Sequence, residues 1–194
     1  MNEIEAALGD RLTRILKADA VVWPALTAAR AADLPSWRIV SGALYGAVWN
    51  ALTGRPAGHG LKDVDLAYFD ASDLSWEAED AAIRLARPFF GEPPAPVEIR
   101  NQARVHLWFE QRFGQPYPPL RSVEEGIDRY ASRNHAVGVR LCADDRLDIY
   151  APFGLSEIFA LEIRPNRALE NRATHAEKAR RAQACWPELT VEPW

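Results

Sequence analysis

The stretch LKDVDLAYFD, residues 61–70, places two aspartates one residue apart within an apolar segment. In a β-strand, successive side chains alternate between the two faces, so Asp63 and Asp65 would share one face while Val64 and Leu66 point to the core. Two adjacent carboxylates repel each other, and one of them keeps a proton unless a cation lies between them. A hard divalent ion, Mg²⁺ above all, relieves this repulsion and completes its shell with water and substrate phosphates. The pair therefore indicates a metal site for a phosphate-bearing substrate.

A simpler interpretation stays open, in which Asp63 caps the strand start and Asp65 pairs with an arginine on a half-exposed sheet. The segment IVSGALYGAVWN (39–50) favours the metal site, because a strand runs into Ser41-Gly42 and a helix follows at once. A helix N-terminus offers free N–H groups and a positive dipole end to a phosphate. Gly42 lets the backbone approach a ligand, and Ser41 adds a hydroxyl. A plain Ser-Gly turn that caps a helix would have the same sequence.

A third acid follows in PVEIRNQ, residues 96–102. If Val97 and Ile99 face the core, Glu98 lies on the opposite face and joins the aspartate pair, provided that the two strands are neighbours. Three carboxylates from two strands can hold two metal ions, one activating a hydroxyl and the other binding a triphosphate and its leaving pyrophosphate. An ordinary ion pair of Glu98 is the alternative, and Asp148 in RLDIYAP is a second candidate for the third acid.

The composition is that of a folded globular protein. The chain has 194 residues, of which 48% are hydrophobic and seven are tryptophan, enough for a sizeable core. The formal net charge of −4 argues against a molecule built as a whole to bind polyphosphates. Cys142 and Cys185 lie far apart and belong to no CxxC or Cys/His cluster. Neither a disulfide scaffold nor a zinc site is expected.

The first residues and the hydropathy pattern bear on location. Residues 1–20 are charged and amphipathic and lack the apolar core of a signal peptide. No apolar run approaches the roughly 18 residues of a membrane span. We therefore expect a cytoplasmic protein with no membrane partner.

Hydrophobic periodicity and turn residues predict mixed helices and strands. Ser75 is a predicted N-cap, and Ser122 with Glu125 forms a predicted capping box. The order predicts an α+β fold with a small mixed β-sheet flanked by helices. The predicted helices cover residues 2–17, 20–32, 43–53, 75–90, 102–113, 122–136 and 170–186, with another beginning in 154–166. The predicted strands cover residues 37–42, 63–70 and 97–101, followed by a hairpin over 136–152.

Several blocks together resemble a bacterial family grouped with the nucleotidyltransferases related to DNA polymerase β. The resemblance covers roughly residues 36–190 and implies a nucleotidyltransferase-like fold over one domain, residues 1–194. Within it, residues 1–35 would be an N-terminal helical part and residues 36–194 the catalytic core with the C-terminal helices. The blocks are SGALYGAVWN (41–50), KDVDLAYFD (62–70), VEIRNQARVHLWF (97–109), YAPFGLSEIF (150–159) and IRPN (163–166).

This resemblance implies an enzyme that moves a nucleoside monophosphate from an NTP such as ATP to an unidentified hydroxyl. Ser41 and Gly42 would hold the triphosphate, Asp63 and Asp65 would bind Mg²⁺ or Mn²⁺, and Glu98 would be the third acid. The sequence departs from the usual pattern twice. Ser-Gly reverses the common Gly-Ser order, and the aspartate pair follows only after an intervening loop, as in aminoglycoside nucleotidyltransferases.

Other polar and aromatic residues are weaker candidates. Arg104 is the predicted substrate contact, because a planar guanidinium matches a phosphate or carboxylate. Tyr45 and Trp49 could line a base or acceptor pocket, although packing against a neighbouring helix is the favoured explanation. His59 could contact a phosphate or belong to a flexible loop, and His106 could be a general base.

Residues 164–181 carry a local net charge of +4, which could attract a triphosphate or a nucleic acid. A solvated helix face is the simpler explanation, so nucleic acid is possible but not indicated. Two other functions fit the aspartate pair. One is a catalytically degenerate nucleotidyltransferase fold that binds a nucleotide or a protein. The other is a metal-dependent glycosyltransferase, which would normally need a longer chain.

Overall fold

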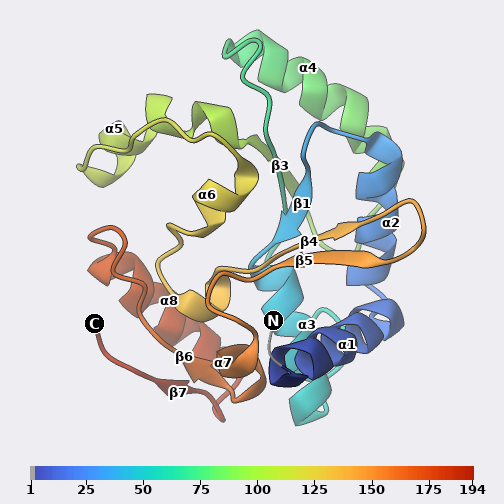
Figure 1. Ribbon diagram of the computed structural model, residues 1–194, viewed down its shortest axis with the longest axis vertical. Helices are drawn as coiled ribbons and strands as arrows, with labels where there is room; N and C mark the ends of the chain where they lie inside the picture. The colour runs from blue at the N-terminus through green and yellow to red at the C-terminus, as the bar shows by residue number, and fades with distance from the viewer. Residues whose placement is uncertain (1–2) are drawn as a thin grey trace.

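The computed structural model describes residues 3–194, so Asn2 of the predicted first helix lies outside the described residues. Helices and strands alternate as expected for an α+β fold (Figure 1). The α-helices are α1 (Glu3–Ala18), α2 (Val22–Ala32), α3 (Gly42–Thr53), α4 (Trp76–Ala86), α5 (Phe109–Phe113), α6 (Val123–Ile127), α7 (Ser156–Phe159) and α8 (Arg172–Cys185). The strands are β1 (Arg38–Val40), β2 (Val64–Tyr68), β3 (Val97–Asn101), β4 (Gly138–Leu141), β5 (Leu147–Tyr150), β6 (Glu162–Ile163) and β7 (Thr190–Val191). Three short 3₁₀ helices are η1 (Arg87–Phe90), η2 (Gln102–Leu107) and η3 (Arg133–His135).

Five strands form one mixed sheet in the order β3-β2-β1-β4-β5. The pair β2–β3 is parallel, and the pairs β1–β2, β1–β4 and β4–β5 are antiparallel. The predicted hairpin is the β4–β5 pair. A separate parallel pair, β6–β7, lies beside α8 (Figure 1). The mixed sheet confirms the predicted fold class.

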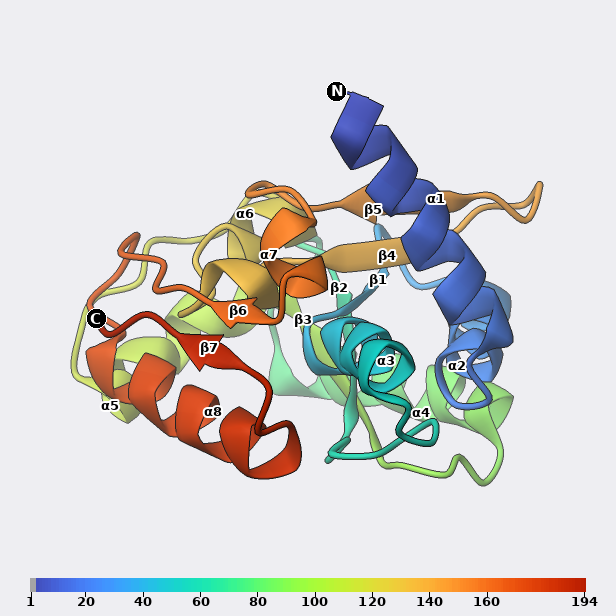
Figure 2. The same ribbon diagram turned by 90° about the horizontal axis from the view of Figure 1, so that it is seen from below.

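The main core lies between one face of this sheet and the first three helices. Ile39, Leu66 and Ile99 are neighbours in the strand register and are buried in it, while the residues next to them along each strand point to the other face. Figure 2 shows α3 beside the sheet, with α1 and α2 on one side of it and α8 on the other. On α3, Trp49 is fully buried and donates its indole N–H to the carbonyl of Ile158 over 3.0 Å. This bond ties α3 to α7 and confirms packing, rather than ligand binding, for this ring.

The opposite face of the sheet is partly covered as well. Val40 and Ala67 are buried there against Val123 and Ile127 of α6. The face that carries Asp65 is therefore a partly enclosed surface, because α6 limits the access of water beyond the aspartate.

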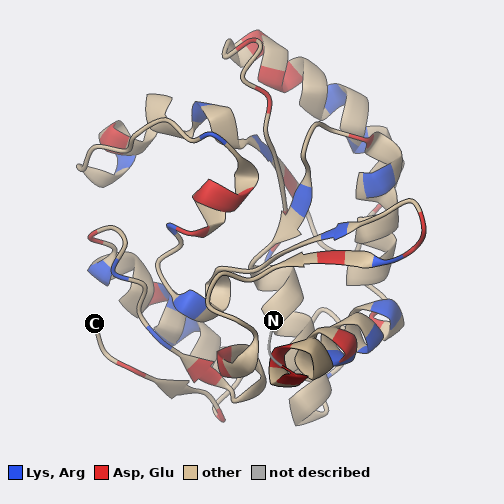
Figure 3. Ribbon diagram, viewed as in Figure 1, with Lys and Arg blue, Asp and Glu red and all other residues tan. Residues whose placement is uncertain are grey.

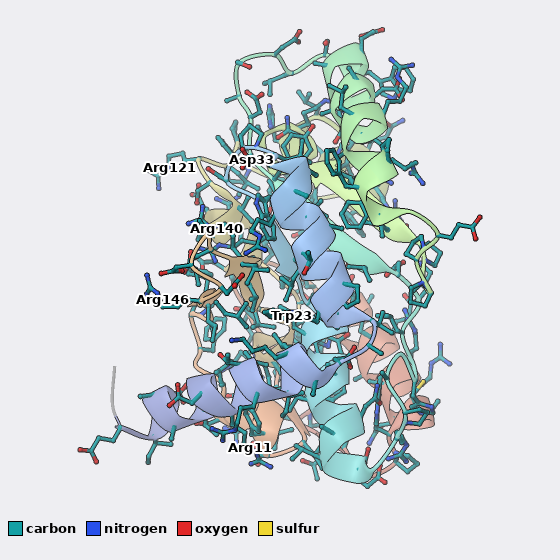
Figure 4. All side chains as sticks on the ribbon, turned by 90° about the vertical axis from the view of Figure 1, so that its right-hand side faces the viewer. Arg11, Trp23, Asp33, Arg121, Arg140 and Arg146 are labelled. Atoms are coloured by element: carbon teal, nitrogen blue, oxygen red, sulfur yellow. The ribbon has the colours of Figure 1, made fainter. Side chains whose placement is uncertain are left out.

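The two N-terminal helices are attached to the rest of the fold at specific points. Figure 4 shows α1 crossing α2, with Trp23 near the start of α2 and Asp33 at its end. Asp33 has a left-handed conformation (φ 48°) and its N–H closes the helix on the carbonyl of Ala29, a common helix end. Near the other end of the pair, Glu5 accepts hydrogen bonds from the Leu155 N–H and the Ser156 hydroxyl, which joins α1 to the start of α7.

Four predicted helices are shorter than the sequence pattern indicated. The helix predicted over 75–90 is capped by Ser75, as expected, but changes to η1 at Arg87. Pro88 explains the change, because proline lacks the N–H that an α-helix would use there. The helix predicted over 154–166 is α7 alone, after which the chain becomes β6.

The helices predicted over 102–113 and 122–136 are each broken by tertiary contacts. The first is η2 followed by α5, and it starts in 3₁₀ form because the Asn101 side chain accepts the Ala103 N–H. The second is α6 followed by η3. One of the two hydrogen bonds of its predicted capping box is present, from the Glu125 N–H to the Ser122 hydroxyl. The Glu125 carboxylate accepts the N–H of Arg121 in place of the N–H of Ser122.

Candidate active site

The turn between β1 and α3 has an unusual backbone conformation. Ser41 is buried and has φ 57° and ψ −115°, a region that residues other than glycine rarely adopt. Such conformations cost about 1–3 kcal/mol and concentrate at functional sites. The Ser41 N–H donates to the Val137 carbonyl over 2.9 Å, which fixes the turn to the strand segment beside it. The N–H groups of the first turn of α3 therefore have a fixed direction.

Strand pairing brings the aspartates to this turn. Because β1 and β2 are antiparallel, Val40 lies opposite Asp65, and the next residue of the β1 strand end, Ser41, lies beside the start of β2. Asp63 comes one residue before β2 begins. The two sequence blocks that were predicted to act together are therefore adjacent in space.

Parallel pairing brings in the third acid. Asp65 and Glu98 are Cα partners in the β2–β3 register, so their side chains leave the sheet next to each other on the same face. Asp148 is on β5, at the far edge of the sheet, and its carboxylate accepts from Arg38 over 2.9 Å and from Arg140 over 3.3 Å. Of the two candidates from the sequence, only Glu98 lies beside the aspartates.

The three acids are electrostatically coupled. Burial, and after it the charge of Asp63, raises the pKa of Asp65 from 3.8 to about 6, and Glu98 contributes in the same direction. Asp63 pairs with Lys62 over 3.1 Å, and Glu98 is 3.8 Å from Arg100. Lysine and arginine thus balance the outer acids, while Asp65 remains partly unneutralised between them.

A helix that is distant in sequence supplies further cations. Lys178 of α8 lies near Asp65. Desolvation lowers the pKa of Lys178, and the negative charge of Asp65 acts in the opposite direction. Arg181 lies one turn further along α8 and lines the same pocket as Lys178. Figure 3 shows that charged residues of both signs lie along α8, and the pairs of Arg164, Arg167 and Arg172 with glutamates use part of the basic segment structurally.

These groups surround an open pocket, whose space of about 560 Å³ includes the solvent at its mouth. Tyr45 forms part of its wall, and burial raises the pKa of the Tyr45 phenol to about 12 although Ser41 hydrogen-bonds it. Trp186 forms another part and packs on Gly60, where a Cβ would come within 2.4 Å of the ring. The lining residues are Ser41, Gly42, Tyr45, Gly60, Leu61, Lys62, Asp63, Asp65, Lys178, Arg181, Ala182, Cys185 and Trp186.

The donor set suits a hard divalent cation. The three acids offer only carboxylate oxygens, the ligands that Mg²⁺ prefers, and the raised pKa of Asp65 shows that a cation would be favoured there. Across residues 3–194, no three or more Asp, Glu, His or Cys side chains are already gathered as a metal-binding group. Asp63 and Glu98 are turned to Lys62 and Arg100, so holding an ion requires them to rotate toward Asp65.

Arg104, the predicted substrate contact, does not line the pocket. Its guanidinium makes an ion pair with Glu79 of α4 and donates to the Leu74 carbonyl over 3.0 Å. Both partners of the ion pair are only 12% exposed. The physical reason is local: η2 turns the side chain toward α4, where it joins α4 to the strand β3. His59 is likewise half-buried and packed on Trp186 rather than part of a free loop.

Sequence reasoning did not identify Lys178, Arg181 or Trp186 as site residues. The local excess of positive charge in residues 164–181 was the available signal for the two cations, but it did not separate them from the arginines around them. For Trp186 the only sequence signal was the Gly60 that it packs on, and that contact spans 126 residues of chain.

Comparisons with known proteins agree with this geometry. The model of a nucleotidyltransferase family matches residues 27–191. A solved structure described as revealing a CCA-adding enzyme head domain is 23% identical, with 93% of this chain and 95% of that chain covered and a TM-score of 0.72, which shows a common fold. A tRNA-processing enzyme complex aligns with 86% of this chain and 42% of its own, at 17% identity and a TM-score of 0.47. No match is found among curated proteins.

Proposed function

We propose that this chain, which belongs to the nucleotidyltransferase family, transfers a nucleoside monophosphate from an NTP to a hydroxyl acceptor in a reaction that depends on Mg²⁺ or Mn²⁺. One observation carries the proposal. The Ser41-Gly42 helix start and the registered pair Asp65 and Glu98 open into one connected site. A phosphate-binding backbone beside clustered carboxylates is what nucleotidyl transfer requires.

The triphosphate end of the NTP would lie in the 560 Å³ pocket. The N–H groups at the start of α3 and the Ser41 hydroxyl would donate to phosphate oxygens. Lys62, Lys178 and Arg181 line the same pocket and would neutralise the charge that develops on the leaving pyrophosphate. Lys62 comes from the segment before β2, whereas Lys178 and Arg181 come from α8, and three cations around one pocket support a polyphosphate rather than a single phosphate as the ligand.

Asp63, Asp65 and Glu98 would hold the divalent ion, which supplies charge neutralisation for the triphosphate and lowers the pKa of the acceptor hydroxyl. In the reaction, the acceptor oxygen forms a bond to the α-phosphorus, and the bond from that phosphorus to the bridging oxygen of pyrophosphate breaks. The acceptor proton passes to a carboxylate of the site.

Ligand-dependent thermal unfolding tests the nucleotide and metal parts of this proposal. Each NTP is added to the protein with Mg²⁺, with Mn²⁺ or with EDTA. A ligand at about 100 times its Kd stabilises the folded state by about 2.7 kcal/mol, which raises Tm by roughly 5–10 °C in a chain of this size. We expect this rise with the metal and a much smaller one with EDTA. Equal shifts in both conditions would favour the alternative, a degenerate fold that binds nucleotides without metal.

A variant pair localises the effect. Asp63→Asn removes a proposed metal ligand and should abolish the metal-dependent part of the shift. Asp73→Asn is the matched control, since Asp73 is an exposed aspartate that accepts the Ser75 N–H in the loop before α4. It should keep the full shift. If both variants respond alike, the metal does not bind at the aspartate pair.

A further inference from the structure

A second pocket, of about 500 Å³, continues from the first one at Asp65. The two pockets share Ser41, Asp65 and Lys178, and from these residues they extend in different directions. The first runs toward the start of β2 and the end of α8. The second runs along β2 and β3 and ends at Tyr130, beyond α6. Asp65 therefore stands between two separate openings.

The geometry of phosphoryl transfer gives each opening a role. The attacking and leaving oxygens lie on opposite sides of the phosphorus, roughly in line. If pyrophosphate leaves into the first pocket, where Lys62 and Arg181 gather, the acceptor hydroxyl must approach from the other side of Asp65. Within residues 3–194, the second pocket shares Asp65 with the first and opens on that side.

The walls of the second pocket carry hydrogen-bond donors. Arg100 follows Glu98 on the same face of β3 and lies opposite Ala67. Its side chain is 59% exposed, and its guanidinium is 3.8 Å from the Glu98 carboxylate, which is a weak ion pair. If Glu98 turns toward Asp65 to serve as the third acid, Arg100 loses that partner. Gln102 adds an amide from the end of the same strand. A guanidinium without an acid partner, with the Gln102 amide beside it, favours a ligand that carries an anionic group.

Tyr130 is held in place at the far wall. The Asn166 side chain donates to the carbonyls of Asp128 and Tyr130 over 2.7 and 2.8 Å, and the Asn166 N–H donates to the Ala131 carbonyl. Burial raises the pKa of the Tyr130 phenol, so its hydroxyl keeps its proton and donates. The block IRPN (163–166) therefore has a role that the sequence did not reveal, which is to fix this wall.

We infer that the second pocket binds the acceptor, and that the acceptor is a small hydroxyl compound with an anionic group, a phosphate or a carboxylate, that Arg100 recognises. This inference rests on the proposed function. The small size follows from the pocket and from the charge of the protein. A nucleic acid would be held by many Lys and Arg side chains along its phosphate backbone, whereas this pocket is lined by two cations, Arg100 and Lys178.

A matched series of three-carbon compounds tests the acceptor class. Glycerol, glycerate and glycerol 3-phosphate are offered with the preferred NTP and Mg²⁺, and a short RNA with a free 3′-hydroxyl is a fourth arm. Pyrophosphate release and the nucleotidylated product are both measured, and thermal shifts in the presence of a non-hydrolysable NTP analogue report binding without turnover. We expect glycerate or glycerol 3-phosphate to bind and react in preference to glycerol and RNA.

Variants of Arg100 assign the preference to this pocket. Losing a charge-assisted hydrogen bond costs about 10–100-fold in affinity, so Arg100→Gln should lower the preference for the anionic compound over glycerol about 10–100-fold. Arg100→Lys keeps the charge and should restore part of it. The control is Arg140→Gln, which removes a half-buried strand arginine that is paired with Asp148 toward the opposite edge of the sheet and should change nothing.

The outcomes separate the two proposals. Metal-dependent release of pyrophosphate by the wild type supports the proposed function whatever the acceptor is. The acceptor inference is wrong if glycerol or RNA then reacts as well as the anionic compounds, or if Arg100→Gln keeps the preference for them. The acceptor inference is equally wrong if no compound of the series binds. If no NTP yields pyrophosphate under any condition, the proposed function fails and the acceptor inference fails with it.

Discussion

Replacing Asp65 by asparagine should make the protein more stable at neutral pH and have little such effect in acid. Asp65 is half-buried beside two other acids, and burial with the Asp63 charge raises its pKa from 3.8 to about 6. Below pH 3.8 the carboxyl is protonated in both the folded and the unfolded chain and costs nothing. As the pH rises through about 6, the folded protein must release a proton that the unfolded chain has already lost, so stability falls.

The pKa values set the magnitude. Each pKa unit corresponds to about 1.4 kcal/mol, so the rise from 3.8 to about 6 gives roughly 3 kcal/mol as an upper bound. Because water still reaches the half-buried carboxyl, we expect about 2 kcal/mol. An asparagine has nearly the same shape and does not titrate. The stability difference between Asp65→Asn and the wild type should therefore be about 2 kcal/mol larger at pH 7.5 than at pH 4.

Urea denaturation of both proteins across this pH range, in EDTA, measures the difference, and any pH-independent cost of the substitution cancels. Asp70→Asn provides a control of opposite sign, because hydrogen bonds from Ser72 lower the pKa of Asp70. That variant should lose stability relative to the wild type as the pH rises toward 3.8, and it should then run parallel to the wild type up to pH 7.5, because Asp70 is ionised in both the folded and the unfolded chain there. Parallel pH curves for Asp65→Asn and the wild type would refute the claim that the three acids repel one another in the folded protein.

Three further substitutions separate structure from ligand binding. Gly60→Ala should destabilise the fold by about 2–4 kcal/mol in chemical denaturation, because the new Cβ would meet the ring of Trp186 at 2.4 Å and φ is +71°; a loss under about 1 kcal/mol would contradict this packing. Ser41→Gly should relieve the backbone conformation with φ 57° and raise stability by about 1 kcal/mol, while the lost hydroxyl weakens NTP binding in calorimetry. Arg104→Met should destabilise the protein by about 3 kcal/mol, because Glu79 loses its buried partner, and should leave the calorimetric affinity for NTP unchanged at temperatures where the variant is folded.

Much of the site could be predicted because its residues follow from local rules. Alternation along a strand puts Asp63 and Asp65 opposite the apolar residues that form the core, and a Ser-Gly step between a strand and a helix marks a helix start. The neighbouring position of Glu98 depended on one expectation, that β3 lies beside β2, and the parallel register Asp65 to Glu98 meets it. The resemblance to a family added the order of these blocks.

The remaining residues could not be predicted because their positions depend on long-range packing. Arg104 has the chemistry of a phosphate ligand, but the 3₁₀ turn of η2 directs it to Glu79. Lys178 and Arg181 belong to a basic segment far along the chain from Asp65. Its cations look alike in sequence until the fold places these two at the pocket and pairs Arg164 and Arg172 with glutamates. Helix lengths failed for a similar reason: the Asn101 side chain, which caps the Ala103 N–H, also bonds the backbone N–H and carbonyl of Asp70, and such contacts override periodicity. Among residues 3–194, no helix is long and apolar enough to span a membrane.

The central claim is that Asp63, Asp65 and Glu98 form a working nucleotidyl-transfer site. The most direct measurement is pyrophosphate release from each NTP, with Mg²⁺ and a mixture of hydroxyl compounds, by the wild type, Asp63→Ala and Asp73→Ala. We predict release by the wild type and Asp73→Ala, and a loss of at least about 100-fold in Asp63→Ala, the scale on which removing a charge-stabilising group lowers kcat, with the fold intact by circular dichroism. Equal release by all three proteins would contradict the claim.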